Sequence, residues 1–493
     1  MGYPPCRPLF IRLIFHFGWV HFPSMAYLHE EATPIPPGPP SIQPIQSAPM
    51  KHVVIIGNGI AGVTAARYIR KFSRYSVTLI SAESKYFFSR TALMYVYMGH
   101  MRMEDITPYE PWFWDKNDIS LIQAYVQAVD IHQKKLSLSN GKDMHYDTLV
   151  IASGSTFNKF DWPGQDLEGV GGLYSLQDLD YMETYTRKAN RAVVVGGGLI
   201  GIEMAEMLLS RGIQTTFLVR ENSYWSNVLP AEESAMVNRH IREHHVDLRL
   251  GTELKRIIGD EYGRVKAVET SAGDTIECQW VGLTAGVRPN VEFLKHSGIE
   301  LGKGVKVDEF FRTSAPDVYA IGDCAEFRTA PLGRGTLEQI WYSGKMHGEQ
   351  VAANICKEST PYQPGVFFNS AKFFDIEYQT YGHVPPTWTS SVDSLYWEHP
   401  DGQRSIRILY EQTSQKVLGF NLMGVRYRHK VCERWIRNET PIAEVLLDLR
   451  AANFDPEFFS EYEPLVIAQY NSKTGSNLRL RKRRQLFHLI FGR

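Results

Sequence analysis

Two glycine-rich segments carry the clearest chemical signal in this sequence. They are Gly57–Gly62 and Gly196–Gly201, and each has the spacing G-x-G-x-x-G. In such a turn the first glycine permits a tight bend, the second lets the backbone approach a pyrophosphate, and the third lets a helix pack on a strand. The free N–H groups at the start of that helix attract phosphate. Each segment therefore predicts a dinucleotide site, with contacts expected from Gly57, Gly59, Ile60, Ala61 and Gly62, and from Gly196, Gly198, Leu199, Ile200 and Gly201.

Apolar runs on either side of the glycines are the elements that must position them. The first unit is predicted as a buried strand, a helix and a second strand over 51–56, 63–72 and 76–80. The second unit is predicted in the same order over 192–195, 202–209 and 215–219. Short β-branched runs of this kind are typical of parallel strands buried on both faces. Two dinucleotides bound face to face are what a flavoprotein needs to pass a hydride from nicotinamide to flavin.

Two carboxylates are placed to complete the first site. Asp323 follows a short apolar strand, and Gly322 before it permits close backbone approach, so Asp323 can accept hydrogen bonds from a polyol chain. Glu83 is expected on the adenosine ribose, although it stands two residues beyond Ser81, where the strand ends. A solvated loop carboxylate is the alternative for Glu83. Two further segments, 146–154 and 284–290, each combine an apolar run or turn with glycine. We expect Ala152, Gly154 and Gly286 in them to contact the bound dinucleotides.

In this ordered set of motifs, from Lys51 to Ile355, the sequence resembles the FAD-dependent pyridine nucleotide-disulfide oxidoreductases, which include glutathione reductase and rubredoxin reductase. The resemblance implies an α/β fold with two Rossmann-like domains, for FAD and NAD(P), and a C-terminal α+β domain. It implies that the first glycine motif and Glu83 hold the FAD pyrophosphate and ribose, that Val126 meets the adenine, and that Asp323 meets the ribitol. The second glycine motif would hold the nicotinamide dinucleotide.

The branch of that family is indicated by the absence of a cysteine nucleophile. Residues 81–95 contain no cysteine, whereas disulfide reductases and cysteine-based peroxidases carry a redox-active thiol there. Hydroxyl groups cannot replace a thiolate at neutral pH. The stretch instead resembles the diaphorase half of nitrite reductase and the rubredoxin-type reductases. No clustered cysteines follow that could hold the siroheme and iron–sulfur centres of nitrite reductase.

The same resemblance places two further residues beside the cofactors. Arg90 is expected to contact the flavin or a phosphate, with a surface arginine as the alternative. Ferredoxin reductases of this group have a lysine five residues after that arginine, which can pair with the glutamate of the second motif. Here that position is Tyr95, so Glu203 becomes a candidate contact to the nicotinamide rather than half of an ion pair.

The choice between NADH and NADPH depends on the end of the strand predicted over 215–219. An acid there binds a free ribose 2′-hydroxyl, whereas an arginine accommodates a 2′-phosphate. The sequence continues Arg220-Glu221, and a second arginine of the NADPH-using glutathione reductases falls on Ser226. The prediction leans to NADPH, and NADH remains open.

Composition excludes several other classes. The chain has 493 residues, 43% of them hydrophobic, and a net charge of −1, which gives no global attraction for nucleic acid. Its five cysteines are scattered without a C-x-x-C pair, which argues against a disulfide framework or a structural zinc site and favours a reducing cytoplasm. No metal is expected.

The predicted organisation has five parts. They are a disordered Pro-rich extension over 1–50, an FAD domain over 51–160 and 284–356, an NAD(P) domain over 161–283, a C-terminal domain over 357–470 that packs on the FAD domain and often makes a dimer in the family, and a basic tail over 471–493. Two alternatives also explain the extension: translation starts at Met25 or Met50, or the segment anchors the protein to a membrane or a partner. The tail is either solvated or binds an anionic membrane or an acidic protein.

We expect an FAD enzyme that takes hydride from NAD(P)H and passes electrons to a ferredoxin-like or rubredoxin-like protein or to a quinone. No side-chain nucleophile is required, because the flavin carries the chemistry and the protein positions it. The alternative is a partner-binding flavoprotein controlled by its redox state, like apoptosis-inducing factor.

Overall fold

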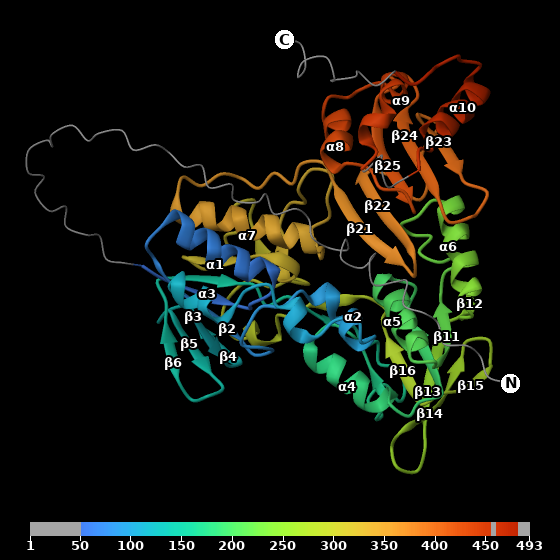
Figure 1. Cartoon of the computed structure of the whole chain (residues 1–493). Coiled ribbons are helices and arrows are strands. Elements are labelled where there is room, and N and C mark those ends of the chain that lie inside the picture. Colours follow the sequence, from blue (N-terminus) through green and yellow to red (C-terminus); the bar gives the residue numbers. More distant parts are fainter. Residues whose placement is uncertain (1–50, 455–459, 482–493) are drawn as a thin grey trace, which may run out of the picture. The chain divides into compact units, whose positions relative to one another are not determined.

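The computed structural model describes residues 51–454 and 460–481 (Figure 1). The extension predicted over 1–50, with Cys6, and residues 482–493 of the predicted basic tail lie outside the described residues. Within the described part, no helix is both long enough and apolar enough to cross a membrane.

The first glycine turn follows the central strand of a five-stranded parallel sheet, at the carboxyl end of the strands. The strand order is β19 (Val318–Ala320), β7 (Thr148–Ile151), β1 (His52–Ile56), β2 (Ser76–Ser81) and β3 (Ile119–Gln123). In the register of this sheet, Ile56 lies opposite both Ile80 and Ile151. The carboxyl ends of the central strands therefore meet at one edge, which is where ligands bind in parallel sheets.

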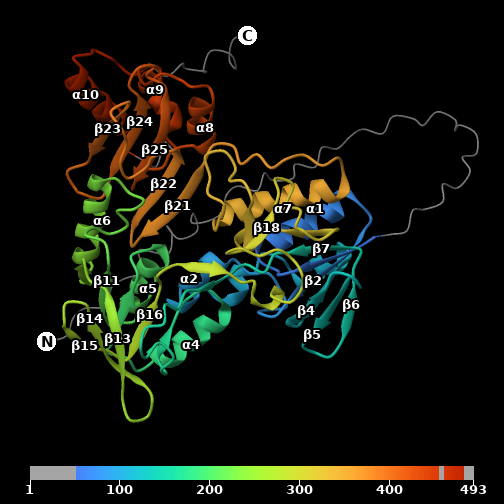
Figure 2. The ribbon, with the colours of Figure 1, turned by 180° about the vertical axis from the view of Figure 1, so that it is seen from behind.

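Two long helices pack together beside this sheet. They are α1 (Ile60–Phe72), whose first turn includes the last three residues of the first glycine segment, and α7 (Trp341–Cys356), as Figures 1 and 2 show. Gly348 of α7 permits the contact, because a Cβ there would lie 2.5 Å from the carbonyl oxygen of Ala61. From the sequence, this helix is expected over 337–356, but Leu337 bridges to Glu326 in extended backbone, so α7 begins four residues later.

The second glycine turn belongs to a second parallel sheet built in the same way. Its order is β12 (Asp247–Leu250), β11 (Gln214–Val219), β10 (Arg191–Val195), β16 (Trp280–Leu283) and β9 (Val170–Gly171). Helix α5 (Leu199–Ser210) follows the turn and packs on β10 and β11. The two parallel sheets with their helices confirm the predicted pair of Rossmann-like folds.

Each parallel sheet is accompanied by a small antiparallel meander. The first is formed by β4 (Val126–Asp130), β5 (Lys135–Leu138) and β6 (Asp143–His145), and the second by β13 (Leu254–Gly259), β14 (Val265–Thr270) and β15 (Thr275–Glu277). The chain passes between the two sheets through β8 (Ser155–Phe157) and β17 (Val287–Pro289), which pair antiparallel to each other. This pairing holds the two connections between the parallel sheets next to each other.

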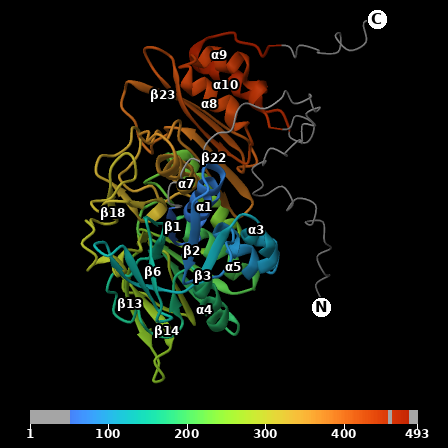
Figure 3. The ribbon, with the colours of Figure 1, turned by 90° about the vertical axis from the view of Figure 1, so that its left-hand side faces the viewer.

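A third, antiparallel sheet forms the C-terminal α+β part (Figure 3). Its order is β21 (Phe368–Phe373), β22 (Ile376–Gly382), β25 (Val417–Met423), β24 (Ser405–Glu411) and β23 (Val392–Glu398). Helices α8 (His429–Arg437), α9 (Ile442–Leu447) and α10 (Glu463–Thr474) share an apolar core with it. Helix α10 runs past residue 470, where the basic tail was expected to start, and Leu478 and Leu480 still pack on this core.

From the sequence, strands are expected over 371–376 and 381–384. The first prediction is wrong, because Phe374 and Asp375 form a two-residue turn between β21 and β22. The second strand, β22, begins earlier for the same reason, and β23 is not predicted from the sequence. The remaining helices and short strands are α2 (Leu93–Tyr97), α3 (Pro111–Lys116), α4 (Leu176–Thr186), α6 (Ala231–Glu243), β18 (Val305–Val307) and β20 (Ala325–Phe327).

Candidate functional site

A cavity of about 860 Å³ opens where the first parallel sheet ends. This volume is within the range of sites for small molecules and cofactors. Its wall takes backbone from the first glycine turn, from the ends of β2 and β7, and from the start of α5 in the second unit. The predicted residues that line it are Gly57, Gly59, Ile60, Ala61, Glu83, Arg90, Val126, Ala152, Gly154, Leu199, Ile200, Glu203, Gly322 and Asp323.

The first glycine turn has the geometry that a pyrophosphate requires. Gly57 has φ +108°, and a Cβ on it would lie 2.1 Å from the carbonyl oxygen of Ala152. A Cβ on Gly62 would lie 2.0 Å from the carbonyl oxygen of Gly57, so α1 packs closely on the turn. At Gly59, by contrast, a Cβ would meet nothing within 4 Å, and Gly59 lines the cavity. The turn therefore leaves open space at the position where a dinucleotide phosphate would lie.

Asp323 stands at another wall of the same cavity, after β19. Ser155 Oγ and Tyr174 Oη lie 3.1 and 3.2 Å from its Oδ2 and donate to it. Gln339 in turn donates to Ser155 Oγ at 2.9 Å. Removal from water raises the pKa of the Asp323 carboxyl, with the two donors and Arg90 acting against this. Within the described chain Oδ1 makes no hydrogen bond, so it is free to accept one from a ligand.

Glu83 and Arg90 face each other across the cavity wall. Arg90 Nη1 and Nη2 lie 2.8 and 2.6 Å from the two oxygens of Glu83, and Arg90 also donates to the carbonyl of Tyr174 at 2.5 Å. The Leu176 N–H adds a bond of 2.8 Å to Glu83 Oε1. The side chains are 18% and 27% exposed, so neither is a freely solvated group. A ribose bound to Glu83 would therefore share its carboxylate with Arg90, which already donates to both oxygens.

Glu203 lines the cavity from α5 and belongs to a small charged cluster. Burial, and after it the charge of Glu206, raise the pKa of Glu203 to about 7, against the opposing charge of Lys372. Lys372 Nζ lies 2.7 Å from Glu206 Oε1 and 5.8 Å from the centre of the Tyr95 ring. Lys372 comes from β21, far away in the sequence. The cation missing at position 95 is therefore supplied by the C-terminal sheet, and it pairs with Glu206 rather than with Glu203.

The second glycine turn repeats the first in its backbone. Gly196 has φ +118°, and a Cβ on Gly201 would lie 2.3 Å from the carbonyl oxygen of Gly196. Gly198 caps α5, and Tyr224 Oη donates to its carbonyl at 3.1 Å. The predicted residues that lie outside the wall of the cavity are Gly62, Gly196, Gly198, Gly201, Arg220, Glu221 and Gly286.

Arg220 and Glu221 lie just beyond β11 and pair with each other. Arg220 Nη2 is 3.0 Å from Glu221 Oε1, and the Arg220 side chain is 72% exposed. This position at the strand end suits a ribose contact. The pair leaves the choice between NADH and NADPH open, since each partner neutralises the other.

Sequence reasoning missed Tyr174, Ser155, Gln339 and Lys372. None of them lies in a recognisable motif, and each reaches the site from an element outside the glycine turns. From the sequence, Trp341 and Tyr342 are candidates for a place near the flavin, with core packing as the alternative. In the structure Trp341 lines the cavity, whereas the Tyr342 hydroxyl hydrogen-bonds with Ser370. In the described ranges, no cysteine lines the cavity.

Comparison with known proteins agrees with this arrangement. A family model described as pyridine nucleotide-disulphide oxidoreductase matches residues 51–348. Nitrite reductase [NAD(P)H] of Bacillus subtilis is 29% identical over 332 residues, which cover 66% of this chain and 40% of the relative. Rubredoxin-NAD(+) reductase of Pseudomonas putida is 28% identical over 312 residues, which cover 63% of this chain and 81% of that relative. The chain thus spans less than half of the first relative's length.

Among solved structures, the covalent putidaredoxin reductase–putidaredoxin complex matches with a TM-score of 0.70 at 20% identity, covering 86% of this chain and 99% of that chain. At this identity the match concerns the fold. It covers a larger share of the chain than the family match over residues 51–348 does.

Proposed function

Because this chain belongs to the pyridine nucleotide-disulphide oxidoreductase family and is an FAD-dependent NAD(P)H oxidoreductase, we propose that it passes electrons from a reduced nicotinamide nucleotide to a small redox protein of the rubredoxin or ferredoxin class. The family match confirms the resemblance, the enzyme class and the two cofactors predicted from the motifs. The redox partner and the roles of the site residues are our proposals.

One observation carries the proposal: a single cavity is lined both by the first glycine turn with Asp323 and by the first turn of α5. Gly57–Gly62 would hold the pyrophosphate of FAD and Asp323 its ribitol. Leu199, Ile200 and Glu203 would face the nicotinamide from the other side. The flavin, when bound, supplies the hydride acceptor. The residues of the chain hold the two rings in one place and keep water from between them, which is the contribution of positioning.

Glu203 has a further role in this proposal. With a pKa of about 7, its carboxyl keeps a proton at neutral pH more readily than an ordinary glutamate does. A neutral carboxyl donates a hydrogen bond, which an ionised one cannot do. We assign Glu203 as a positioning residue that offers this bond to the nicotinamide, while Lys372 neutralises Glu206 beside it.

The acceptor class is supported by the relative named rubredoxin-NAD(+) reductase, which is matched over 81% of its length. Reduction of nitrite by this chain alone is not proposed, since the chain spans 40% of the nitrite reductase.

Stopped-flow spectroscopy of the purified flavoprotein tests the proposal. NADH and NADPH are each mixed with it, and the reduced protein is then mixed with ferricyanide, a rubredoxin or a [2Fe–2S] ferredoxin. We expect rapid bleaching of the flavin and rapid reoxidation by at least one of the two proteins. Reoxidation by ferricyanide alone would refute the redox-protein acceptor. Slow bleaching with a change in oligomeric size would favour the redox-controlled binding protein instead.

A further inference from the structure

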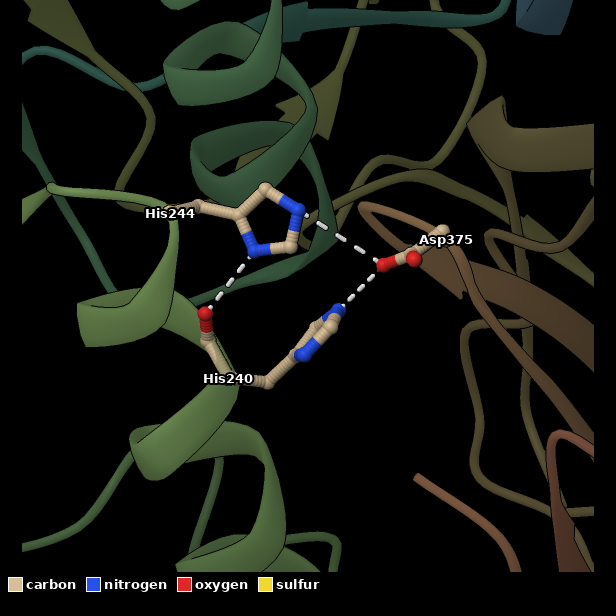
Figure 4. Close-up of side chains that lie close together, drawn as sticks. All are labelled: His240, His244 and Asp375. Atoms are coloured by element: carbon tan, nitrogen blue, oxygen red, sulfur yellow. Dashed lines mark hydrogen bonds and ion pairs between the residues drawn. The ribbon is translucent and has the colours of Figure 1, made fainter. Parts of the chain in front are cut away.

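A second group of side chains lies outside the cofactor cavity, where α6 meets the turn between β21 and β22. His240 and His244 are four residues apart at the end of α6, so their rings lie on one face. Asp375 belongs to the two-residue turn between the strands and points at both rings, as Figure 4 shows. One ligand atom from each of the three residues lies within 4.8 Å of the others.

The three groups are close enough to share one metal ion if they move slightly apart. His240 Nε2 bonds directly to Asp375 Oδ1, and His244 Nε2 lies 3.6 Å from the same oxygen. Bonds of 2.0–2.2 Å from Zn²⁺ to nitrogen and oxygen place tetrahedral ligand atoms about 3.4 Å apart. Small side-chain shifts would therefore admit an ion between the three groups.

The hydrogen bond behind His244 fixes which ring nitrogen faces the aspartate. His244 Nδ1 lies 3.0 Å from the carbonyl oxygen of His240. A carbonyl only accepts, so Nδ1 carries the hydrogen and, in the neutral ring, Nε2 presents a lone pair to Asp375. A lone pair facing a carboxylate is unfavourable unless a cation lies between them, either a proton or a metal.

His240 has the surroundings of an oriented ligand. Its side chain is 2% exposed, and Glu243 Oε2 lies 3.5 Å from its Nδ1 without a hydrogen bond between them. Metal-binding histidines commonly direct their second nitrogen to a carboxylate or a carbonyl, and Glu243 is close enough to become that partner after a small shift. His244 and Asp375 are 35% and 60% exposed, which leaves a route for an ion from solvent.

Phe374 holds the turn against the helix. Its ring stacks on His244 with centroids 4.3 Å apart and 14° between the planes. It does so with φ +55°, a backbone conformation that bulky side chains rarely adopt. The aspartate is thus presented to the histidines by a specific turn.

We propose that His240, His244 and Asp375 bind a divalent transition metal of the Zn²⁺ class and so clip α6 to the β21–β22 turn. Two imidazoles and one carboxylate suit Zn²⁺ rather than Mg²⁺ or Ca²⁺, which prefer oxygen ligands. Water would complete a tetrahedral site. The proposal is independent of the redox partner and of the cofactor cavity.

Titration calorimetry with ZnCl₂ and metal analysis of the full-length flavoprotein, after dialysis against a chelator, test the site. Asp375→Asn and His244→Ala remove ligands that are partly exposed, so the buried His240 stays intact. His245→Asn is the matched control, because His245 is exposed, adjacent and at φ +62°, which asparagine tolerates. Circular dichroism and flavin content verify that each variant is folded.

We expect one Zn²⁺ per chain in the wild type and in His245→Asn. Affinity should fall more than about 100-fold in the two ligand variants, because loss of an outer partner alone costs 10–100-fold. The proposal is overturned if the wild type binds no Zn²⁺ at this stoichiometry. It is equally overturned if the ligand variants bind like the wild type or if His245→Asn loses the ion as they do. If one of the two ligand variants fails to fold, the Zn²⁺ affinity of the other variant tests the proposal.

Discussion

Replacing Glu203 by glutamine should make the folded protein more stable at high pH, and this tests the electrostatics of the site directly. The Glu203 carboxyl has a pKa of about 7 in the folded chain against an ordinary value of 4.5. The folded state therefore holds the proton more tightly than the unfolded state does. Stability is greatest below pH 4.5 and falls as the pH rises to 7, because only the unfolded chain releases the proton in this window.

The magnitude follows from that difference in pKa. One pKa unit corresponds to about 1.4 kcal/mol, so the full loss at high pH is about 3 kcal/mol. Most of it develops between pH 5 and pH 8. Since Glu203 faces the cavity, water reduces the effect, and we expect a change of about 1–2.5 kcal/mol over this interval. Glutamine has nearly the same shape and no charge, so the variant should not show this loss.

The assay is urea unfolding of the wild type and of Glu203→Gln at pH 5 and pH 8. The quantity compared is the difference in free energy of unfolding between the two proteins. Its value at pH 8 minus its value at pH 5 isolates the effect of the carboxyl charge, because any effect of the amide itself cancels. Glu110→Gln, at an exposed position, serves as the control and should give a value near zero. A value near zero for Glu203→Gln as well would refute the raised pKa and with it the proposed neutral carboxyl.

Three further predictions concern the cofactors. Asp323→Ala should deplete the bound flavin, measured as FAD per chain, whereas Asp317→Asn should not, because Asp317 is exposed and asparagine tolerates its φ of +58°; full occupancy in Asp323→Ala would place the ribitol elsewhere. A folded variant without its five cysteines should still reduce dyes with NAD(P)H, because no thiol takes part, and a loss of hydride transfer would contradict this. If Arg220 contacts a 2′-phosphate, Arg220→Ala should lower kcat/KM for NADPH by about 10- to 150-fold, the equivalent of about 1.5–3 kcal/mol, and leave NADH little changed. Glu221→Ala should weaken NADH instead if it binds the ribose, and equal losses for both nucleotides in Arg220→Ala would show that the arginine supports the loop.

The sequence by itself determined the two dinucleotide folds and most of the residues around the first glycine turn. The reason is that this information is local. A tight bend, a close helix and an open approach to phosphate each require glycine at a fixed spacing, and apolar runs beside them require buried parallel strands. Gly57, Gly62 and Gly196 occupy the positions where a side chain would collide with backbone. The carboxylate of Asp323 follows from the same local pattern, since it comes shortly after a short buried strand.

The tertiary structure alone decided which distant residues meet. Lys372 reaches Glu206 from the C-terminal sheet, so the charge balance beside Glu203 could not be read from the segment around Tyr95. The turn at Phe374 and Asp375 interrupts an apolar run that looks like a continuous strand, because the hairpin is held by its contact with α6. The same contact assembles His240, His244 and Asp375 from 135 residues apart. Spacing along the chain fixes only near neighbours, whereas the packing of the sheets brings these groups together.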